Sequence, residues 1–361
     1  MTPLPRPERL LIVMLRRIGD VLLTVPAARA LRKLFPEARI DFLAEPPAHE
    51  LLVGNPDISE VLRYGAPGGG PGVASEAAKY LYWLWRVRRR RYDWVIDYMG
   101  NPRTAFLTAF SGAAVKAGPG HVSHRWAYTH PLRESSTPFY SAREKIRVLR
   151  SLGLEPDETD FLPSITEDPA AETRAAEALE RLGLSGAVVA GMAPASRRRT
   201  RRWPARHFAR LGSLLRDRCG ARLLVFWGPG ERGLAEDVVR GAGDGAVLAP
   251  ETRSLRDLAA LIGRCRLLVT NCNGPKHIAV ARRVPTLTIH GSSDPVLWNP
   301  PDAQRHPAAR RQGLDCLGCQ LNDCPGDLAC LEGLSPDDVF PEARRLLGLP
   351  ARGALRREGR A

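Results

Sequence analysis

Short apolar runs, of the length and composition of buried strands, alternate with helical patterns along the chain. Strands are predicted in the first half at 9–15, 38–44, 58–64, 92–98 and 113–118, and in the second half at 186–194, 221–228, 266–271 and 284–291. Helices are predicted at 21–34, at 204–218, from Glu231 onward and after His277. Strands that alternate with helices are typical of an α/β fold with parallel sheets.

The same order of elements occurs in both halves, and a length of 361 residues suits two domains. The predicted divisions are an N-terminal domain at 1–155, a linker at 156–170, a C-terminal domain at 171–335, and a C-terminal helix with a basic tail at 336–361. Each domain is predicted to be doubly wound and Rossmann-like, and their strand ends are expected to face each other across a cleft. The glycine- and proline-rich stretch 65–72 is predicted to be a loop.

Charge and hydropathy narrow the class of protein. The chain has 53 Lys and Arg against 39 Asp and Glu, a net charge of +14, and only five of the basic residues are lysines. This excess of arginine has two explanations. Either the genome favours arginine codons, or the protein binds an anionic partner such as a phosphorylated substrate, a membrane surface or nucleic acid. No apolar run approaches the ~18 residues of a transmembrane helix, and no signal-peptide cleavage site follows the N-terminus, so we expect a cytoplasmic protein.

The turn after the first predicted strand reads Arg16-Arg17-Ile18-Gly19-Asp20. Ligands of open α/β sheets bind beyond the carboxyl ends of strands, so this turn is expected to face a ligand. Gly19 allows the backbone to turn tightly into the helix. Asp20 either caps the helix N-terminus or acts as a catalytic base.

A basic loop at 194–204 follows a strand in the second half. It holds five arginines together with Ser196 and Thr200, just ahead of a helix N-terminus. Guanidinium groups, backbone amides and the helix dipole together form an anion site, unless the loop is simply solvated.

Two further turns of the second half suit parts of a nucleotide. Glu231 ends a Gly-Pro-Gly turn and either caps the next helix or accepts hydrogen bonds from ribose hydroxyls. In the turn 271–277, Gly274 permits close approach to a phosphate, and Lys276 and His277 add donors.

Taken in order, these turns resemble the motifs of glycosyltransferase family 9, the ADP-heptose:lipopolysaccharide heptosyltransferases. The resemblance covers nearly the whole chain, and its motifs are specific as a set rather than singly. They are the strand, Gly-Asp turn and Pro-Ala helix at 14–36, the strand with Tyr92, Asp93 and Asp97, the Arg-Trp-Pro segment at 201–204, the turn at 228–231, the Gly-Pro-x-His-Ile-Ala segment at 274–279, and Ser293, Asp294, Pro295 and Trp298.

The resemblance implies a GT-B fold, with the acceptor bound by the first domain and the nucleotide sugar by the second. It implies inverting transfer without a catalytic metal ion, from ADP-heptose to a phosphorylated glycolipid of the lipopolysaccharide core or a related glycan. Asp20 matches the family's proposed base. The expected acceptor contacts are Arg16, Arg17, Gly19, His121, His124 and Arg125. The expected donor contacts are Ser196, Thr200, Arg201, Arg202, Glu231, Asn271, Cys272, Asn273, Gly274, Pro275, Lys276 and His277.

The fourth turn departs from the family pattern. The family has Asp-Ser-Gly where this chain has Cys272-Asn273-Gly274, and a cysteine cannot accept hydrogen bonds as a carboxylate does. We expect Asn271 or Asn273 to compensate in part and Lys276 to add a charge beside the phosphates. One alternative is therefore a GT-B protein that has lost catalysis and serves in binding or assembly. A nucleic-acid-binding protein is less favoured, because the chain lacks RNP aromatics, helix-turn-helix spacing and paired zinc fingers.

Two segments lie outside these turns. Structural zinc, disulfides and reduced thiols are all open alternatives for the cluster of Cys316, Cys319, Cys324 and Cys330. Residues 79–94 read KYLYWLWRVRRRRYDW, in which aromatics precede five arginines within six residues. This stretch is either a helix with buried aromatics and a solvated basic end, or a surface that contacts the inner face of the cytoplasmic membrane.

Overall fold

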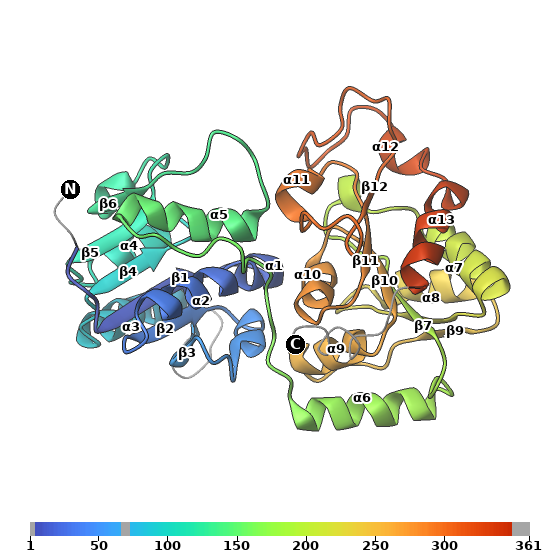
Figure 1. Ribbon diagram of the computed structural model, residues 1–361, viewed down its shortest axis with the longest axis horizontal. Coiled ribbons are helices and arrows are strands. Elements are labelled where there is room, and N and C mark those ends of the chain that lie inside the picture. Colours follow the sequence, from blue (N-terminus) through green and yellow to red (C-terminus); the bar gives the residue numbers. More distant parts are fainter. Residues whose placement is uncertain (1–3, 66–72, 349–361) are drawn as a thin grey trace, which may run out of the picture. The chain divides into compact units, whose positions relative to one another are not determined.

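The computed structural model describes residues 4–65 and 73–348. The chain divides into two compact units, Met1–Thr166 and Glu167–Ala361. Most of the predicted loop at 65–72 and almost all of the predicted basic tail lie outside the described residues. Each unit is built on its own parallel sheet (Figure 1).

The first unit contains a six-stranded parallel sheet with the order β3-β2-β1-β4-β5-β6. Its strands are β1 (Arg9–Met14), β2 (Arg39–Ala44), β3 (Glu60–Arg63), β4 (Trp94–Asp97), β5 (Val115–Pro119) and β6 (His130–Leu132). Its helices, with short 3-10 helices labelled η, are α1 (Ile18–Leu22), α2 (Val25–Leu34), η1 (Ala48–Leu52), α3 (Val73–Arg89), α4 (Pro102–Ala109), η2 (Arg125–Ala127), α5 (Ser141–Arg147) and η3 (Val148–Leu152).

Helices cover both faces of this sheet because its central strand is apolar on both sides. Leu10 and Ile12 of β1 share a core cluster with α2, α5 and η3, whereas Leu11 and Val13 share another with α3 and α4. Successive side chains of a strand point to opposite faces, so a continuous apolar run is typical of a strand buried on both sides.

The second unit contains a six-stranded parallel sheet with the order β12-β11-β10-β7-β8-β9. Its strands are β7 (Val189–Ala193), β8 (Arg222–Val225), β9 (Ala246–Leu248), β10 (Leu267–Asn271), β11 (Thr286–Ile289) and β12 (Ala308–Ala309). Its helices are α6 (Pro169–Arg181), η4 (Arg199–Arg201), α7 (Ala205–Cys219), α8 (Arg232–Ala242), α9 (Leu255–Gly263), α10 (Gly274–Ala281), α11 (Pro295–Trp298), α12 (Ala329–Glu332) and α13 (Pro336–Leu347).

The predicted C-terminal helix, α13, is part of the core of the second unit. Val339 and Phe340 of α13 share a cluster with Phe208 and Leu211 of α7. None of the described helices is long and apolar enough to span a membrane.

The predicted fold class, α/β with two doubly wound parallel sheets, is confirmed, and so are all nine predicted strands. Sequence analysis missed β6, β9 and β12, which have only three, three and two residues. The prediction of one helix over 21–34 is wrong, because the chain forms α1 and then α2 with a break at Leu23 and Thr24. Pro26 has no N–H to donate to the carbonyl of Leu22, so a continuous helix would lose a hydrogen bond there.

Part of the predicted linker is fixed to the first unit. Arg29 Nη1 donates to Asp160 Oδ1 at 2.6 Å, and Lys33 Nζ donates to Asp157 Oδ2 at 3.0 Å. Both basic residues lie on α2, so the chain stays on the first unit well beyond residue 155.

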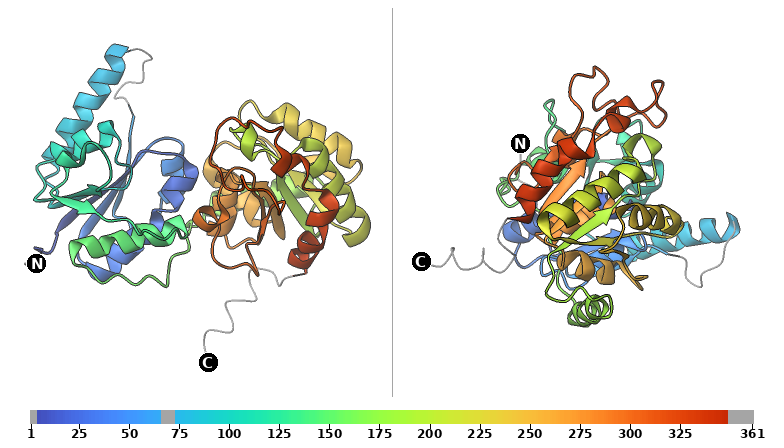
Figure 2. Two further views of the ribbon diagram at one scale, coloured as in Figure 1. Left: turned by 90° about the horizontal axis from the view of Figure 1, so that it is seen from above. Right: turned by 90° about the vertical axis from the view of Figure 1, so that its right-hand side faces the viewer.

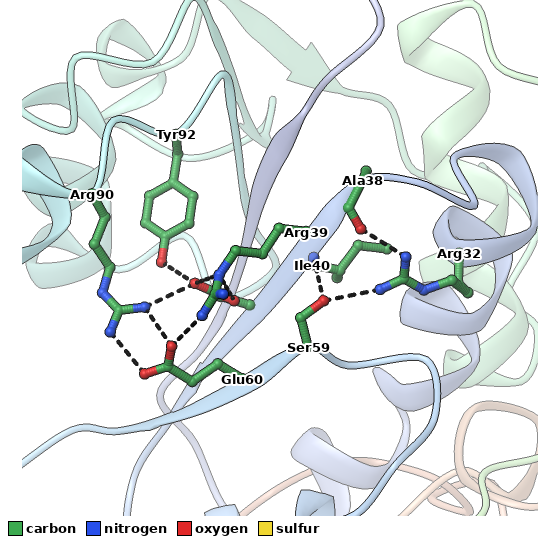
Figure 3. A network of polar contacts seen from close by, with 9 residues as sticks. Arg32, Ala38, Arg39, Ile40, Ser59, Glu60, Arg90 and Tyr92 are labelled. Carbon is green, nitrogen blue, oxygen red and sulfur yellow. Dashed lines mark hydrogen bonds and ion pairs between the residues drawn. The ribbon is translucent and has the colours of Figure 1, made fainter.

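A buried polar network holds the C-terminal end of α3 to the edge of the first sheet (Figure 3). Asp41 of β2 is fully buried and accepts hydrogen bonds from Tyr92 Oη at 2.7 Å and Arg90 Nη1 at 2.9 Å. Arg90 Nη2 also donates to Glu60 Oε1 of β3 at 2.7 Å. Arg90, one of the five clustered arginines, is therefore a structural residue rather than part of a solvated basic end.

Candidate active site

Each sheet has a switch point, where the connections from two neighbouring strands run in opposite directions. In the first sheet β1 lies next to β4, and in the second β7 lies next to β10. Ligands of doubly wound folds bind at the carboxyl ends of strands at such points. Asp20 follows β1, the basic loop 194–204 follows β7, and the turn 271–277 follows β10. Asp20, the basic loop and the turn 271–277 therefore lie at the switch points, whereas Glu231 follows β8 and His121, His124 and Arg125 follow β5.

Asp20 lies in the first turn of α1 but does not cap it. The N-cap residue is Arg17, with extended backbone, and the chain is already helical at Ile18. The alternative that Asp20 is the N-cap is therefore wrong. Its side chain is 23% exposed, and Asp20 Oδ1 lies 4.0 Å from Arg16 Nη1. No residue that the structure describes donates a hydrogen bond to this carboxylate, so it is free to accept one from a ligand.

A second cation near Asp20, Lys145 of α5, was missed by sequence analysis. Its Nζ lies 5.4 Å from the centre of the Tyr98 ring, and Tyr98 Oη donates to the Lys145 carbonyl at 3.0 Å. Burial lowers the pKa of Lys145, and the Asp20 carboxylate opposes this effect. The only signal in the sequence is that Lys145 is one of five lysines in an arginine-rich chain.

Asp97, a residue of the family motif, closes the turn after β4. Its Oδ1 accepts the amides of Met99 and Gly100 at 2.8 and 3.1 Å, and its Oδ2 accepts the Tyr128 hydroxyl at 2.8 Å. Burial raises the pKa of Asp97, and these hydrogen bonds act in the opposite direction. Asp97 thus fixes the loop beside Asp20 without facing a ligand itself.

The expected acceptor contacts differ in their surroundings. His124 Nε2 is hydrogen-bonded to the Gly100 carbonyl, so this histidine supports the same turn. His121 is exposed, and its Nδ1 lies 3.7 Å from Glu134 Oε2. Three exposed arginines remain available to an anionic acceptor: Arg16, Arg17 and Arg125.

In the second unit, two asparagines at the end of β10 hold the loop that follows β7. Asn271 Nδ2 donates to the Pro194 carbonyl at 2.6 Å, and Asn271 Oδ1 accepts the Trp203 amide at 3.0 Å. Asn273 Nδ2 donates to the Ala195 carbonyl at 2.8 Å. Both side chains are engaged with backbone, so their observed role is to join the two loops of the switch point rather than to replace the missing aspartate.

Most polar side chains of the basic loop also bind within the protein. Thr200 is buried and its Oγ1 donates to the Leu321 carbonyl at 2.8 Å. Arg202 donates twice to the Ser196 carbonyl, from Nε at 3.1 Å and from Nη2 at 2.5 Å. These contacts make the loop rigid. Leu321 belongs to the cysteine-rich segment, which thereby supports the basic loop.

Of the arginines in this loop, Arg201 is the one best suited to bind a ligand. Its Nη2 donates to Gln320 Oε1 at 2.9 Å, while its Nε is buried without a partner among the described residues. Burial lowers the pKa of Arg201, and Cys272 lies near enough to oppose this effect. A phosphate oxygen at this position would satisfy the unpaired donor.

Lys276 is fully buried beneath the N-terminal turn of α10. Its Nζ donates to the Trp298 carbonyl and, at 3.2 Å, to Asn299 Oδ1, and it lies 3.9 Å from Cys272 Sγ. Burial lowers the pKa of Lys276. Sequence analysis expected Lys276 to add a donor beside the phosphates. In the structure its ammonium group is enclosed by protein atoms, so it is not exposed to bind a phosphate directly.

His277, the next residue of α10, is buried and its Nδ1 has no partner among the described residues. Burial, together with the charge of Lys276, holds the pKa of His277 well below 6.5. The ring is therefore neutral at pH 7. An unpaired buried nitrogen of this kind is a site for a ligand's hydrogen bond.

Two more buried histidines surround the lysine. His290 Nε2 is bonded to Asn299 Oδ1 at 3.0 Å, and His306 Nδ1 is bonded to Thr286 Oγ1 at 2.9 Å. Burial lowers the pKa of His290 to about 3 and that of His306 to about 4. Both rings are therefore neutral at pH 7, and both lie near enough to Lys276 for its charge to lower their pKa further.

Glu231 occupies the N-cap position of α8, but its side chain does not cap the helix. Its Oε2 accepts the Gly228 amide at 3.0 Å and closes the Gly-Pro-Gly turn. The prediction that the Glu231 side chain caps α8 is therefore wrong. Its half-buried carboxylate stays a predicted contact for ribose.

All four cysteines of the cluster are free thiols; three are exposed and Cys330 is half-buried. Among the described residues, no three His, Cys, Asp or Glu side chains are grouped to hold a metal ion. The structure therefore assembles neither the disulfides nor the zinc site that sequence analysis left open.

The described helices that begin at the second switch point, η4, α7 and α10, lack acidic residues in their first turns. The N-terminus of α10 carries the positive end of its helix dipole, and Arg201 lies beside it. Such a site can bind a phosphate group and stabilise negative charge that develops on it.

Comparison with known proteins agrees with this arrangement. Residues 83–324 match the sequence model of glycosyltransferase family 9 (heptosyltransferase). The chain is similar to lipopolysaccharide heptosyltransferase 3 of Escherichia coli K12, with 28% identity over 92% of this chain and 99% of the relative.

Solved structures resemble the whole chain. A family 9 glycosyltransferase from Veillonella parvula has a TM-score of 0.81 and 25% identity, over 94% of this chain and 97% of that one. An E. coli heptosyltransferase solved with ADP-2-deoxy-2-fluoro heptose has a TM-score of 0.69 and 20% identity, over 92% and 98%. The second likeness supports the predicted GT-B fold alone.

Asn271→Leu tests the joint between the two loops. The substitution leaves the Pro194 carbonyl and the Trp203 amide buried without partners, which costs about 1–3 kcal/mol for each group. We expect the free energy of unfolding in urea to fall by about 2–4 kcal/mol. Asn322→Leu, at an exposed position, is the control and should change it by less than about 0.5 kcal/mol. Equal stabilities of the two variants would contradict the proposed joint.

His306→Gln tests the buried neutral histidines. In the unfolded chain His306 takes up a proton near pH 6.5, whereas the folded protein resists protonation down to about pH 4. The unfolded state therefore binds more protons in this window, and stability falls as pH falls. Urea unfolding at pH 7 and pH 5 should show a loss that is about 2 kcal/mol smaller in His306→Gln than in the wild type. An undiminished loss in His306→Gln would refute the interpretation.

Proposed function

This chain belongs to glycosyltransferase family 9, and we propose that it transfers a heptose from ADP-heptose to a phosphorylated glycolipid of the lipopolysaccharide core or a related glycan. The observation that carries the proposal is the pairing of two features. The Asp20 carboxylate at the first switch point accepts no hydrogen bond from the described residues, and the helix that begins at the second switch point, α10, has no acid in its first turn. Similarity over 99% of a lipopolysaccharide heptosyltransferase supports the choice of sugar and acceptor.

The donor is proposed to bind the second unit through its diphosphate. The unpaired Nε of Arg201 and the unpaired Nδ1 of His277 would donate to phosphate oxygens, beside the positive end of the α10 dipole. Glu231 would accept a hydrogen bond from the ribose. Fixed positive charge then stabilises ADP as it leaves, so the proposed reaction needs no metal ion.

Asp20 is proposed to act as the general base. The acceptor hydroxyl attacks the anomeric carbon from the side opposite the diphosphate, so the configuration at that carbon is inverted. As the new C–O bond forms and the bond to the diphosphate breaks, the hydroxyl proton passes to the Asp20 carboxylate. Arg16 lies 4.0 Å from this carboxylate, and Lys145 is near enough for Asp20 to act on it electrostatically.

The acceptor is proposed to bind the first unit by its phosphates. Arg16, Arg17 and Arg125 are exposed at the carboxyl edge of the sheet and suit bidentate contacts with phosphate. An acceptor of this kind is embedded in a membrane leaflet, which would place the enzyme at the cytoplasmic face of that membrane.

Cys272 changes one donor contact in this proposal. A thiol cannot accept hydrogen bonds from sugar hydroxyls as the family's aspartate would. Its Sγ lies 3.9 Å from the buried Lys276 Nζ. The diphosphate contacts do not involve this position, so nucleotide binding is proposed to persist.

Asp20→Asn tests the proposed reaction. The amide keeps the shape of the side chain but cannot accept the proton, so kcat for heptose transfer should fall about 100- to 10,000-fold. The Kd for ADP, measured by calorimetry, should stay within about twofold because Asp20 lies in the other unit. Glu37→Gln, an exposed carboxylate on the same unit, is the control and should transfer normally. Normal turnover by Asp20→Asn would exclude Asp20 as the base, whereas ADP binding without any turnover in the wild type would favour a binding or assembly role.

A further inference from the structure

The outer surface of α3, α4 and η2 carries large apolar side chains that are exposed. We call these residues the aromatic face: Leu81, Trp85, Phe106, Phe110 and Trp126, each between 42% and 64% exposed. Among the described residues, every exposed large aromatic side chain belongs to this set. Apolar groups gathered in this way mark an interaction surface more often than chance exposure does.

The elements of the aromatic face are neighbours within the first unit. Trp83 of α3 and Leu107 of α4 share one core cluster, so both helices cover the same face of the sheet. Phe106 lies 5.1 Å from Trp126 and 6.2 Å from Phe110, measured between ring centres. The Arg88 guanidinium packs against Gly112, just beyond Phe110, and so connects α3 with the end of α4. In Figure 2, the light-blue helix α3 projects beyond the sheet that it covers.

Positive charge surrounds the aromatic face. Residues 77–133 contain ten Lys and Arg but only two acids, Asp93 and Asp97. Asp97 is fully buried, and Asp93 accepts the amides of Glu8 and Arg9 at 2.8 Å. Neither of these acids pairs with an exposed arginine of the surface, whereas Lys79 pairs with Glu76 and Arg103 pairs with Glu45.

The arginines at the end of α3 divide into two groups. Arg90 is held in the network of Asp41 and Glu60, and Arg86 stacks on Trp83, 4.8 Å from the ring centre. The others are exposed and have no carboxylate partner among the described residues: Arg88, Arg89 and Arg91. Arg89 lies over the ring of Trp85 at 5.2 Å, so apolar and cationic groups are combined at the same place.

We propose that the aromatic face docks on the headgroup region of an anionic lipid bilayer. Tryptophan and phenylalanine rings enter the interface between headgroups and acyl chains, and each nearby arginine adds about 1 kcal/mol of attraction to anionic lipid. Single-stranded nucleic acid would instead need open ring faces for base stacking. Here Phe106 and Phe110 are stacked on each other at an interplanar angle of 4°, and Arg89 covers Trp85.

The aromatic face extends to the edge of the sheet that holds the predicted acceptor site. η2, with Trp126, follows β5, and the adjacent His124 is bonded to Gly100 after β4. The carboxyl ends of parallel strands lie at one edge of a sheet, so the aromatic face reaches the edge at which Asp20 follows β1. This inference goes beyond the proposed function and does not depend on which sugar is transferred.

Vesicle binding tests the proposal directly, without donor or acceptor. Sedimentation should recover the full-length protein with vesicles of equal parts phosphatidylglycerol and phosphatidylethanolamine, but not with vesicles of phosphatidylcholine alone. The double variant Arg88→Gln/Arg89→Gln should weaken the partition coefficient about 25-fold, or about fivefold per arginine, the equivalent of ~1 kcal/mol each. Trp85→Ser/Phe110→Ser should weaken it at least tenfold, and circular dichroism checks that both variants are folded.

Matched controls lie on the second unit. Arg181→Gln/Arg240→Gln removes the same charge from exposed sites on α6 and α8, and Val188→Ser removes an exposed apolar side chain. Both should bind vesicles as the wild type does. Equal loss in the control and in the Arg88→Gln/Arg89→Gln variant would reduce the effect to net charge and overturn the proposal. Salt-sensitive binding to single-stranded RNA with no vesicle binding would also overturn it, in favour of a nucleic-acid partner.

Discussion

The organisation of the second unit depends on hydrogen bonds from two asparagines at the end of β10. Parallel strands end in loops whose backbone groups have no partners in the sheet, and an amide side chain can both donate to and accept from them. Asn271 joins its own strand end to Pro194 and Trp203, and Asn273 adds a bond to Ala195. The basic loop is thereby fixed against the N-terminus of α10. Without this joint the arginines would be a solvated loop, as one of the sequence interpretations supposed.

The positively charged and donor groups at this switch point differ in whether the protein already binds them. Arg201 and the first turn of α10 offer donors that the protein leaves unpaired, whereas Lys276 is enclosed below them by the Trp298 carbonyl and Asn299. The neutral rings of His290 and His306 lie near Lys276. Cys272, which departs from the family pattern, is a neighbour of Lys276 in space. An aspartate at position 272 would lie beside the ammonium group and pair with it, so the cysteine leaves the positive charge of this region uncompensated.

The sequence predicted the fold well because its strands are continuous apolar runs, which are typical of sheets covered on both faces. It failed where the signal is short or depends on tertiary contacts. β12 has two residues, and the break before α2 follows from one proline. The turns that hold the site residues were found, since they follow strands in a fixed order. The roles of individual side chains were not predictable: nothing local in the sequence shows that Thr200 and Arg202 bind backbone or that Lys276 is enclosed. Lys145 approaches Asp20 only through the packing of α5, more than a hundred residues along the chain.

We propose that the second switch point binds the diphosphate of an adenine nucleotide. The most direct test is the thermal unfolding of the purified protein with ADP, UDP, GDP or CMP, each added singly at saturation. ADP should stabilise the protein by about 2.7 kcal/mol at a hundred times its Kd, and the other three nucleotides should give smaller shifts. A larger shift with another nucleotide, or no shift with any of them, would contradict this proposal.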